Sequence, residues 1–158
     1  KKQTKMLDVI TIKGSDDMAI QLASCCHPIP GDPILGYINK EKGLVIHTHD
    51  CQIVNELSLD HDRWVDVEWE PESEKLFNVR LSVLVVNERG MLGKIASVIA
   101  DTESNIDNVS LQDMDGSPFA TLNFLVQVRH RQHLADLLRN LKKITKVNKK
   151  TRVKNYKN

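Results

Sequence analysis

The chain has 158 residues, of which 41% are hydrophobic and 27% are charged, and its formal net charge is +1. This length suits one ordinary domain or two small ones, and the hydrophobic fraction excludes wholesale disorder. No apolar run approaches the about 20 residues that cross a bilayer, so we expect no membrane segment. The first residues, KKQTK, include neither an initiator methionine nor an apolar signal region, which predicts a fragment of a longer protein. Three cysteines cannot all pair with one another, and their clustering with histidine favours a reducing compartment, by default the cytoplasm.

The first half of the chain predicts a small mixed domain. Residues 6–13 alternate as a strand does, with Leu7, Val9 and Thr11 on one side, and residues 15–26 predict a short helix that ends before Pro28. The inner side of that helix would hold Met18, Leu22 and one of the cysteines at 25 and 26. PGDP at 30–33 predicts a turn, and ILGYINK (34–40) and GLVIHT (43–48) predict a hairpin. A helix over 50–59 and a strand over 63–70 follow, with the two tryptophans on opposite strand faces, so that only one is deeply buried.

The polar segment PESEK, residues 71–75, predicts a linker, with a Cys-rich domain at 1–72 and a second domain at 76–158. In the second domain the spacing predicts strands over 77–86, 106–114, 119–128 and 146–154, with helices over 91–103 and 131–144. The residues expected to face its core are Val79, Leu81, Val83, Val85, Leu92, Ile95, Ala96, Ile99, Ala120, Leu122, Phe124, Val126, Val128, Leu134, Leu137, Leu138, Leu141 and Ile144. The order βαββαβ is that of the ferredoxin-like fold, so the predicted class is α+β, a small α/β Cys-rich domain followed by a ferredoxin-like domain.

Three cysteines and a histidine form a candidate zinc site, although their spacing departs from the CxxC pairs of common zinc fingers. Cys25, Cys26, His47 and Cys51 supply the four soft or borderline ligands that structural zinc requires. Adjacent cysteines diverge by about 100° on a helix, so both can bind one ion only if the chain bends at the following His-Pro. A domain of this size gains only about 3–5 kcal/mol from its core, whereas structural zinc contributes on the order of 10–16 kcal/mol. Two alternatives stay open: the cysteines are small hydrophobes in a metal-free core, or Cys51 is a nucleophile with His47 as its base.

Two other motifs are weaker evidence for a metal site. His61-Asp62 is typical of phosphohydrolase metal sites, but those sites need further ligands on a helical scaffold, which this strand-rich part does not offer. DMDGS at 113–117 begins like a calcium loop, but its twelfth position is Phe124, where a bidentate Glu is required. A turn is the better interpretation.

VNERGMLGKI, residues 86–95, predicts a glycine turn between a strand and a helix N-terminus. Backbone N–H groups at such a terminus can bind a carboxylate or a phosphate, although a plain connection is the alternative. The candidate effector-binding residues are Asn87, Arg89, Gly90, Met91 and Leu92.

Charge is unevenly distributed along the chain. Nine of the 22 Lys and Arg residues lie in residues 139–158, which contain no Asp or Glu. This tail could contact phosphates or could be a solvated end that favours solubility. The candidate RNA contacts are Lys142, Lys143, Lys146, Lys149, Lys150 and Arg152.

The stretch LASCCHPIPGDPILGYINKEKGLVIHTHDC, residues 22–51, resembles the zinc-finger or conserved-cysteine domain of RelA/SpoT homologues, the enzymes of the stringent response. Residues 77–154 resemble an ACT domain, and the pair in this order resembles the C-terminal regulatory part of that family, most similar to its SpoT type. By position, Cys25, Cys26, His47 and Cys51 match the family's Cys/His set, and residues 87–92 match its effector loop. His27 stands where a residue that does not bind metal is expected, which adds a rival ligand.

The resemblance implies a regulatory module without a reaction centre of its own, acting on hydrolase and synthetase domains for the alarmone ppGpp that lie upstream. It implies relay of starvation signals to those domains, contact with ribosomal RNA or a regulatory protein, and possible zinc binding. It also implies binding of an amino acid, for which branched-chain amino acids are the candidates, and dimerisation through the ACT domain.

Overall fold

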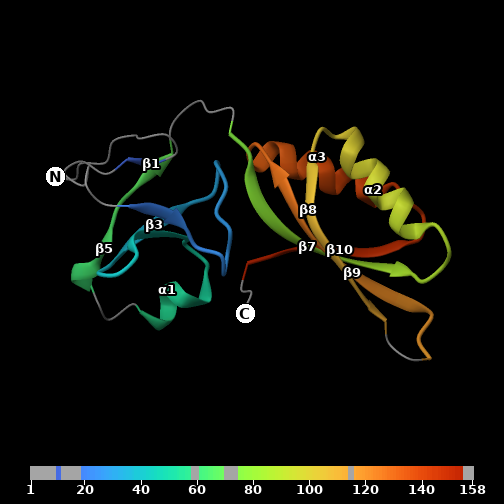
Figure 1. The fold of residues 1–158 in the computed structure, drawn as a ribbon, viewed down its shortest axis with the longest axis horizontal. Coiled ribbons are helices and arrows are strands. Elements are labelled where there is room, and N and C mark those ends of the chain that lie inside the picture. The colour runs from blue at the N-terminus through green and yellow to red at the C-terminus, as the bar shows by residue number, and fades with distance from the viewer. Residues whose placement is uncertain (1–9, 12–18, 58–60, 70–74, 114–115, 155–158) are drawn as a thin grey trace. The chain divides into compact units, whose positions relative to one another are not determined.

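The computed structural model describes residues 10–11, 19–57, 61–69, 75–113 and 116–154 (Figure 1). Backbone contacts divide the chain into two compact units: unit 1 is residues 1–75 with 154–158, and unit 2 is residues 76–153. No helix within the described ranges combines the length and apolar character that a bilayer crossing needs.

The strands of unit 1 are β1 (Ile10–Thr11), β2 (Ile20–Leu22), β3 (Ile34–Asn39), β4 (Gly43–Thr48), β5 (Trp64–Val65) and β6 (Glu68–Trp69), with the short helix α1 (Gln52–Glu56) and the 3-10 turn η1 (His61–Arg63). Four of these strands form a small sheet in the order β2-β4-β3-β5. β2 runs parallel to β4, whereas β3 is antiparallel to both β4 and β5. A separate antiparallel pair joins β1 to β6.

The predicted turn at PGDP is present and is held by a buried aspartate. The backbone N–H of Ile29 donates to the Asp32 carboxylate at 2.9 Å, and the Asp32 N–H donates to the Ile29 carbonyl at 3.0 Å. The Trp69 indole donates to the Asp32 carbonyl at 2.9 Å. These bonds fix the segment that leads from the two adjacent cysteines into β3.

Three expectations for unit 1 are wrong. Residues 20–22 form a strand where a helix was predicted, because their apolar side chains pair alongside β4, and a short apolar run cannot by itself distinguish the two structures. The predicted strand over 63–70 is interrupted at Asp66 and Val67, which separate β5 from β6. Trp64 and Trp69 are both half-buried, so neither is the deeply buried tryptophan that was expected. Predicted segments that lie wholly or partly outside the described residues include the first strand except for 10–11, the start of the helix at 15–18, and residues 71–74 of the linker.

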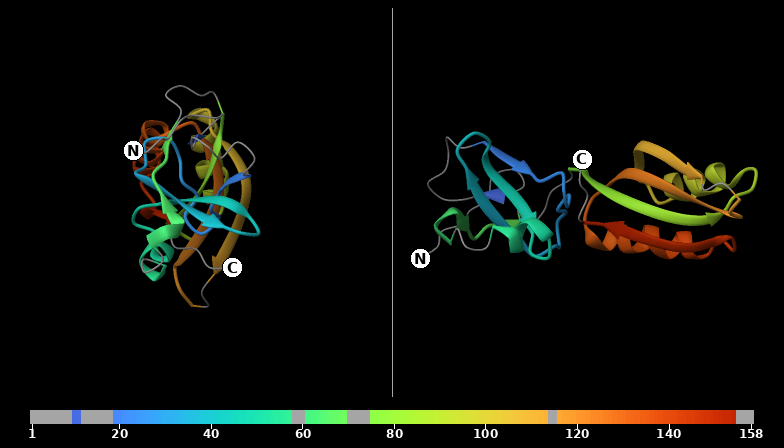
Figure 2. Two further views of the ribbon diagram at one scale, coloured as in Figure 1. Left: turned by 90° about the vertical axis from the view of Figure 1, so that its left-hand side faces the viewer. Right: turned by 90° about the horizontal axis from the view of Figure 1, so that it is seen from below.

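Unit 2 has the predicted βαββαβ order. Its elements are β7 (Phe77–Val86), α2 (Met91–Asp101), β8 (Asn105–Asp113), β9 (Phe119–Val128), α3 (Arg131–Lys142) and β10 (Val147–Val153). The sheet has the strand order β10-β7-β9-β8 with antiparallel pairing throughout. Helices α2 and α3 both cover one face of this sheet (Figures 1 and 2).

The core of unit 2 follows the predicted alternation. Val79, Leu81, Val83 and Val85 of β7 are all buried, as is the predicted stripe on β9, because a strand turns every second side chain to the same face. On α3 the buried leucines are Leu134, Leu137 and Leu141, whereas Leu138 is half-buried. Ile144 is also half-buried and lies after the helix, which ends at Lys142.

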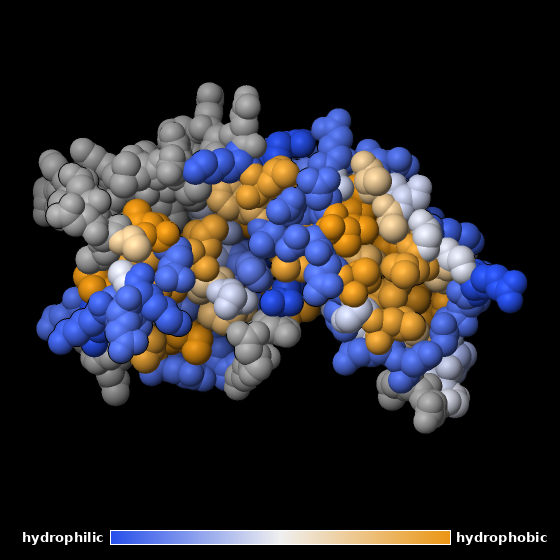
Figure 3. Space-filling view, viewed as in Figure 1, coloured by the Kyte–Doolittle hydropathy of each residue, from blue (hydrophilic) through white to orange (hydrophobic). Residues whose placement is uncertain are grey.

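The predicted phase of α2 is partly wrong. The helix buries Met91, Ile95 and Ile99, which are four residues apart, and leaves Leu92 46% exposed. The inward face of the helix therefore begins at Met91 and not at the predicted Leu92. Ile95 and Ile99 follow Met91 at intervals of four residues, which keep side chains on one helix face. Hydrophobic residues also reach the surface of unit 2 in the view of Figure 3.

Candidate metal centre

Four side chains with metal-binding chemistry gather in unit 1. Cys25 and Cys26 lie in the turn after β2, His47 lies in β4, and Cys51 directly precedes α1. Parallel pairing of β2 with β4 brings that turn beside His47, since the N–H of Ala23 donates to the Ile46 carbonyl at 2.9 Å. A tight turn then returns Cys51, whose N–H donates to the Thr48 carbonyl at 3.1 Å.

The ligand atoms of this cluster, which we call the Cys/His cluster, all lie within 4.8 Å of one another. The Cys25 sulfur lies 3.5 Å from the His47 Nδ1 and 3.5 Å from the Cys51 sulfur. The Cys26 sulfur lies 3.8 Å from the His47 Nδ1 and 4.0 Å from the Cys25 sulfur. The sequence-predicted ligands are therefore brought together.

Four of the six separations are close to those around a tetrahedral zinc ion. Zinc binds sulfur at about 2.3 Å and imidazole nitrogen at about 2.0–2.1 Å, which places tetrahedral sulfurs about 3.8 Å apart and sulfur and nitrogen about 3.6 Å apart. The four quoted distances, from 3.5 to 4.0 Å, lie around these values. Three sulfurs and one imidazole are also a donor set that structural zinc sites use.

Burial controls the protonation of the cluster in the absence of metal. Cys26 and Cys51 are 0% and 1% exposed, and Cys25 is half-buried. Burial, reinforced by the hydrogen bond with Cys51, raises the pKa of Cys25 to about 11, and burial also raises the pKa of Cys26. Burial lowers the pKa of His47 to about 4, so its imidazole is neutral at pH 7, which is the form that binds a metal.

His27, the rival ligand, is not a member of the cluster among the described residues. Its backbone lies in the left-handed region with φ of 47°, directly before the proline that redirects the chain. The two adjacent cysteines lie in a turn and not in a helix, and the expected bend at His27-Pro28 follows them directly.

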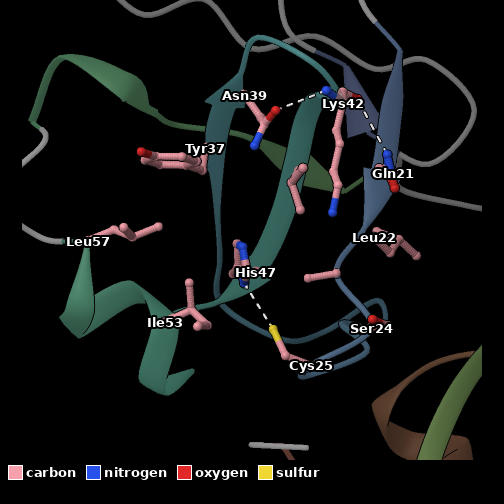
Figure 4. A pocket seen from close by; sticks show the side chains of 12 residues that line it. Gln21, Leu22, Ser24, Cys25, Tyr37, Asn39, Lys42, His47, Ile53 and Leu57 are labelled. Atoms are coloured by element: carbon pink, nitrogen blue, oxygen red, sulfur yellow. Dashed lines mark hydrogen bonds between the residues drawn. The ribbon is translucent and has the colours of Figure 1, made fainter. Parts of the chain in front are cut away.

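A cavity of about 340 Å³ lies beside the cluster (Figure 4). Cys25 and His47 line it, together with the polar residues Gln21, Asn39 and Lys42. Cys26 and Cys51 are not among the described residues that line this cavity.

The candidate effector loop is only partly open to solvent. Arg89 and Gly90 are exposed, and a side chain added at Gly90 would meet nothing within 4 Å. Met91, however, is buried in the core, and the Asn87 side chain donates to the Asp113 carboxylate at 2.8 Å. Leu92 is exposed on the outer side of α2.

The candidate RNA contacts lie at the end of α3 and along β10. Lys142, Lys143, Lys146 and Lys149 are exposed, whereas Lys150 and Arg152 are half-buried. Lys146 forms an ion pair with Glu88 and holds the pKa of that carboxyl below its usual range.

His133 is a buried polar residue that sequence reasoning missed. Its Nε2 donates to the Thr102 carbonyl at 2.6 Å and its Nδ1 accepts from the Arg129 N–H at 2.9 Å, which ties the end of α2 to the start of α3. Its position on the amphipathic helix, between Gln132 and Leu134, gave no signal, because the partners of its imidazole lie outside the helix. They are these two backbone groups and the Ser104 hydroxyl, which lies 3.2 Å from the His133 Nε2. Asp113 and Phe124, from the rejected calcium motif, lie in β8 and β9, and Phe124 is buried.

Two family models match the chain in succession. Residues 10–70 match the RelA/SpoT RIS domain, and residues 73–152 match the ACT domain. The two matched stretches follow one another in the chain as units 1 and 2 do.

Curated relatives carry both parts together. The bifunctional (p)ppGpp synthase/hydrolase SpoT of Escherichia coli (strain K12) is 34% identical over 146 residues, which are 92% of this chain and 21% of that protein. A GTP pyrophosphokinase of Streptomyces coelicolor is 32% identical over 130 residues, which are 82% of this chain and 15% of that protein. The chain thus spans between about a seventh and about a fifth of the length of these relatives.

Two of the solved structures with similarity to the chain each cover about half of it. The ACT domain of a GTP pyrophosphokinase from Chlorobium tepidum is 24% identical with a TM-score of 0.43, covering 49% of this chain and 99% of that one. An acetolactate synthase small subunit from Thermotoga maritima is 21% identical with a TM-score of 0.43, covering 48% of this chain and 46% of that one.

Proposed function

Because the chain belongs to the RelA/SpoT family, whose RIS and ACT domains it contains, we propose that it is a regulatory module of a (p)ppGpp synthetase/hydrolase. The observation that carries this proposal is the succession of the two domains, which matches SpoT over 92% of the chain. In the proposal this chain performs no reaction, and the hydrolase and synthetase reactions belong to catalytic domains upstream of it. The domains proposed are residues 1–72 and 76–158.

Regulation by such a module requires two states of the enzyme that the module, or a ligand bound to it, stabilises unequally. A difference of about 1.4 kcal/mol biases the two states tenfold, so a single charge-assisted contact made in one state has a measurable effect. Starvation signals would act by changing this difference.

The test compares (p)ppGpp hydrolysis and synthesis by the whole protein with those of a version that lacks the 158 residues. We expect the ratio of the two activities to change, and to lose its response to starvation signals. Equal activities and equal responses in both proteins would contradict the proposal.

We further propose that the Cys/His cluster holds structural zinc. Support comes from the four ligand-atom separations and from the neutral form of His47 at pH 7. Zinc would link the turn after β2 to β4 and to the start of α1, and it would make the thiols of the cluster thiolates. Elemental analysis of protein purified without chelators tests this, with about one zinc per chain expected; a metal-free chain with an intact fold would contradict it.

A second candidate function is docking to ribosomal RNA through the basic edge of unit 2. The supporting observation is the exposure of Lys142, Lys143 and Lys149. Binding through phosphates weakens steeply with salt. The logarithm of the affinity falls by about 0.7–0.9 per phosphate contact for each tenfold rise in salt concentration. A binding isotherm that does not change between low and high salt would remove this candidate.

Amino-acid sensing is proposed for residues 87–92, where Arg89 and Gly90 are open to solvent. Calorimetry with branched-chain amino acids tests it on the 158-residue chain, and Arg89→Ala should reduce the heat of binding. Sedimentation of the same samples tests the proposed dimer through the ACT domain.

A further inference from the structure

We infer that Cys25 and Cys51 form a site of reversible oxidation, at which a peroxide converts the two sulfurs into a disulfide. The pairing itself follows from the geometry of the sulfurs. Its consequence, release of the metal, rests on the zinc site proposed above.

Access distinguishes Cys25 from the other two cysteines. Cys25 is half-buried and lines the cavity of about 340 Å³, whereas Cys26 and Cys51 are at most 1% exposed. A cavity of this size is larger than the about 30 Å³ that one water occupies in the liquid, so a hydroperoxide fits inside it. Figure 4 shows the Cys25 sulfur beside His47 at this cavity. A peroxide that enters therefore meets the Cys25 sulfur first.

Distance then selects the second sulfur. Cys51 lies 3.5 Å from the Cys25 sulfur, and Cys26 lies 4.0 Å from it. A disulfide bond is about 2.05 Å long, so the nearer pair must close by about 1.5 Å. Cys26 is disfavoured for two further reasons: it is adjacent in sequence, which makes a bridge a strained ring, and its sulfur accepts the Thr48 N–H at 3.4 Å.

The reaction is balanced with a peroxide as the only oxidant. The Cys25 thiolate attacks one peroxide oxygen, and the O–O bond breaks. Hydroxide departs from the peroxide, and Cys25 becomes a sulfenic acid. The Cys51 thiolate then attacks the Cys25 sulfur, the S–O bond breaks, and a second hydroxide leaves. The two sulfurs together lose two electrons, which the peroxide gains. Of the four zinc ligands, Cys26 and His47 remain, which is too few for a structural site.

The experiment treats the zinc-loaded 158-residue chain with hydrogen peroxide. A chromogenic chelator measures released zinc, and mapping of unreduced peptides locates the bridge. We expect release of about one zinc per chain, loss of two hydrogens from the intact mass, and a peptide linking Cys25 to Cys51 with Cys26 still open to alkylation. Dithiothreitol should reverse the bridge. A bridge that contains Cys26, oxidation without any intramolecular bridge, or no reaction would each overturn the inference.

Variants test the order of events and the route of access. In Cys51→Ala the sulfenic acid should persist on Cys25 and be trapped by dimedone, whereas Cys26→Ala should still form the bridge. Ser24→Trp narrows the cavity at one of its lining residues, so bridging should be slower than in Asn55→Trp, which changes an exposed residue outside it. Equal rates in the two tryptophan variants would overturn access through the cavity.

The zinc content before peroxide separates this inference from the metal proposal. A chain that holds zinc but forms no Cys25–Cys51 bridge overturns only the oxidation site. A chain that forms the bridge without ever holding zinc contradicts only the metal proposal.

Discussion

His47 and His49 are separated by one residue of the chain, but only His47 belongs to the Cys/His cluster; the His49 side chain is at 3.0 Å from the Ile34 carbonyl. Loss of a residue that only hydrogen-bonds to a metal ligand weakens metal binding by about 10–100-fold. We predict that His47→Ala, which removes a ligand itself, weakens zinc binding by more than this. His49→Ala is the matched control and should keep the affinity of the original chain. Competition against a zinc chelator of known affinity measures both, and equal affinities in the two variants would mean that the cluster does not hold the metal.

The stability of the metal-free chain should depend on pH through His47 and Cys25. His47 has a folded pKa of about 4 against an ordinary value of 6.5, so the unfolded chain binds the additional proton and stability falls as the pH drops from 6.5 towards 4. Cys25 has a folded pKa of about 11 against 9.0, so the unfolded chain loses its proton first and stability falls as the pH rises from 9 towards 11.

Urea unfolding across this range, followed by tryptophan fluorescence, should therefore find the highest midpoint between about pH 6.5 and 9. In His47→Gln the decline between pH 6.5 and 5 should become shallower, since this side chain does not titrate. A urea midpoint that rises on acidification below pH 6.5 would contradict a lowered pKa of His47 in the folded chain.

At the scale of single residues, the sequence was a good guide to chemistry and a poor guide to exposure. Cys25, Cys26, His47 and Cys51 were predicted to meet because the end of the predicted helix and the following hairpin would bring together four candidate zinc ligands. The difference between the half-buried Cys25 and the buried Cys26 could not be predicted, since it depends on the turn after β2, where a helix was expected.

Among the elements, the β3–β4 hairpin requires glycine at its turn. Gly43 has a φ of 86°, and a Cβ there would overlap the carbonyl oxygen of Ala19. We predict that Gly43→Ala destabilises unit 1 by about 1–2 kcal/mol for the left-handed backbone, with about 1–3 kcal/mol more from the overlap. Gly116→Ala, with φ of 79° and nothing within 4 Å, should show only the backbone cost in unit 2. Urea denaturation compares the two, and an equal loss would mean that the backbone near Ala19 moves without cost.

Two neighbouring leucines of α3 offer a test of its orientation. Leu137 is fully buried, whereas Leu138 is half-buried. Leu137→Ala should cost about 2–5 kcal/mol of unfolding free energy, because it removes core contacts and leaves a cavity. Leu138→Ala should cost clearly less. If thermal or urea unfolding found the reverse order, the inward face of α3 would be misassigned.

Elements with long regular patterns were predicted well, and short elements were not. The ten residues of β7 alternate without a break, so both the strand and its buried face could be predicted. β2 has three residues, too few to show a period, and its structure depends on β4, which follows more than twenty residues later. On α2, the choice between Met91 and Leu92 as the first inward residue depends on where the helix starts, and boundaries are the least certain feature of a sequence pattern.

For the molecule as a whole, division into two units predicts that metal removal acts on one of them. The two tryptophans, Trp64 and Trp69, both lie in unit 1, so their fluorescence reports its unfolding alone, whereas circular dichroism reports both units. A chelator should lower the unfolding midpoint seen by fluorescence and leave a second transition, seen only by circular dichroism, in place. One coincident transition that moves with the chelator would contradict independent unfolding.

The positions of the four cluster residues along the chain have a consequence for how unit 1 assembles. Cys26 and His47 are 21 residues apart, and Cys25 and Cys51 are 26 apart, with strand β3 lying between them. An ion held by both ends closes a loop around that strand, and loop closure removes conformational freedom from the unfolded chain by an amount that grows slowly with loop length. Occupancy of the cluster would thereby favour the β3–β4 pairing even before the surrounding side chains pack, and coordination would become an early step in the formation of this small domain.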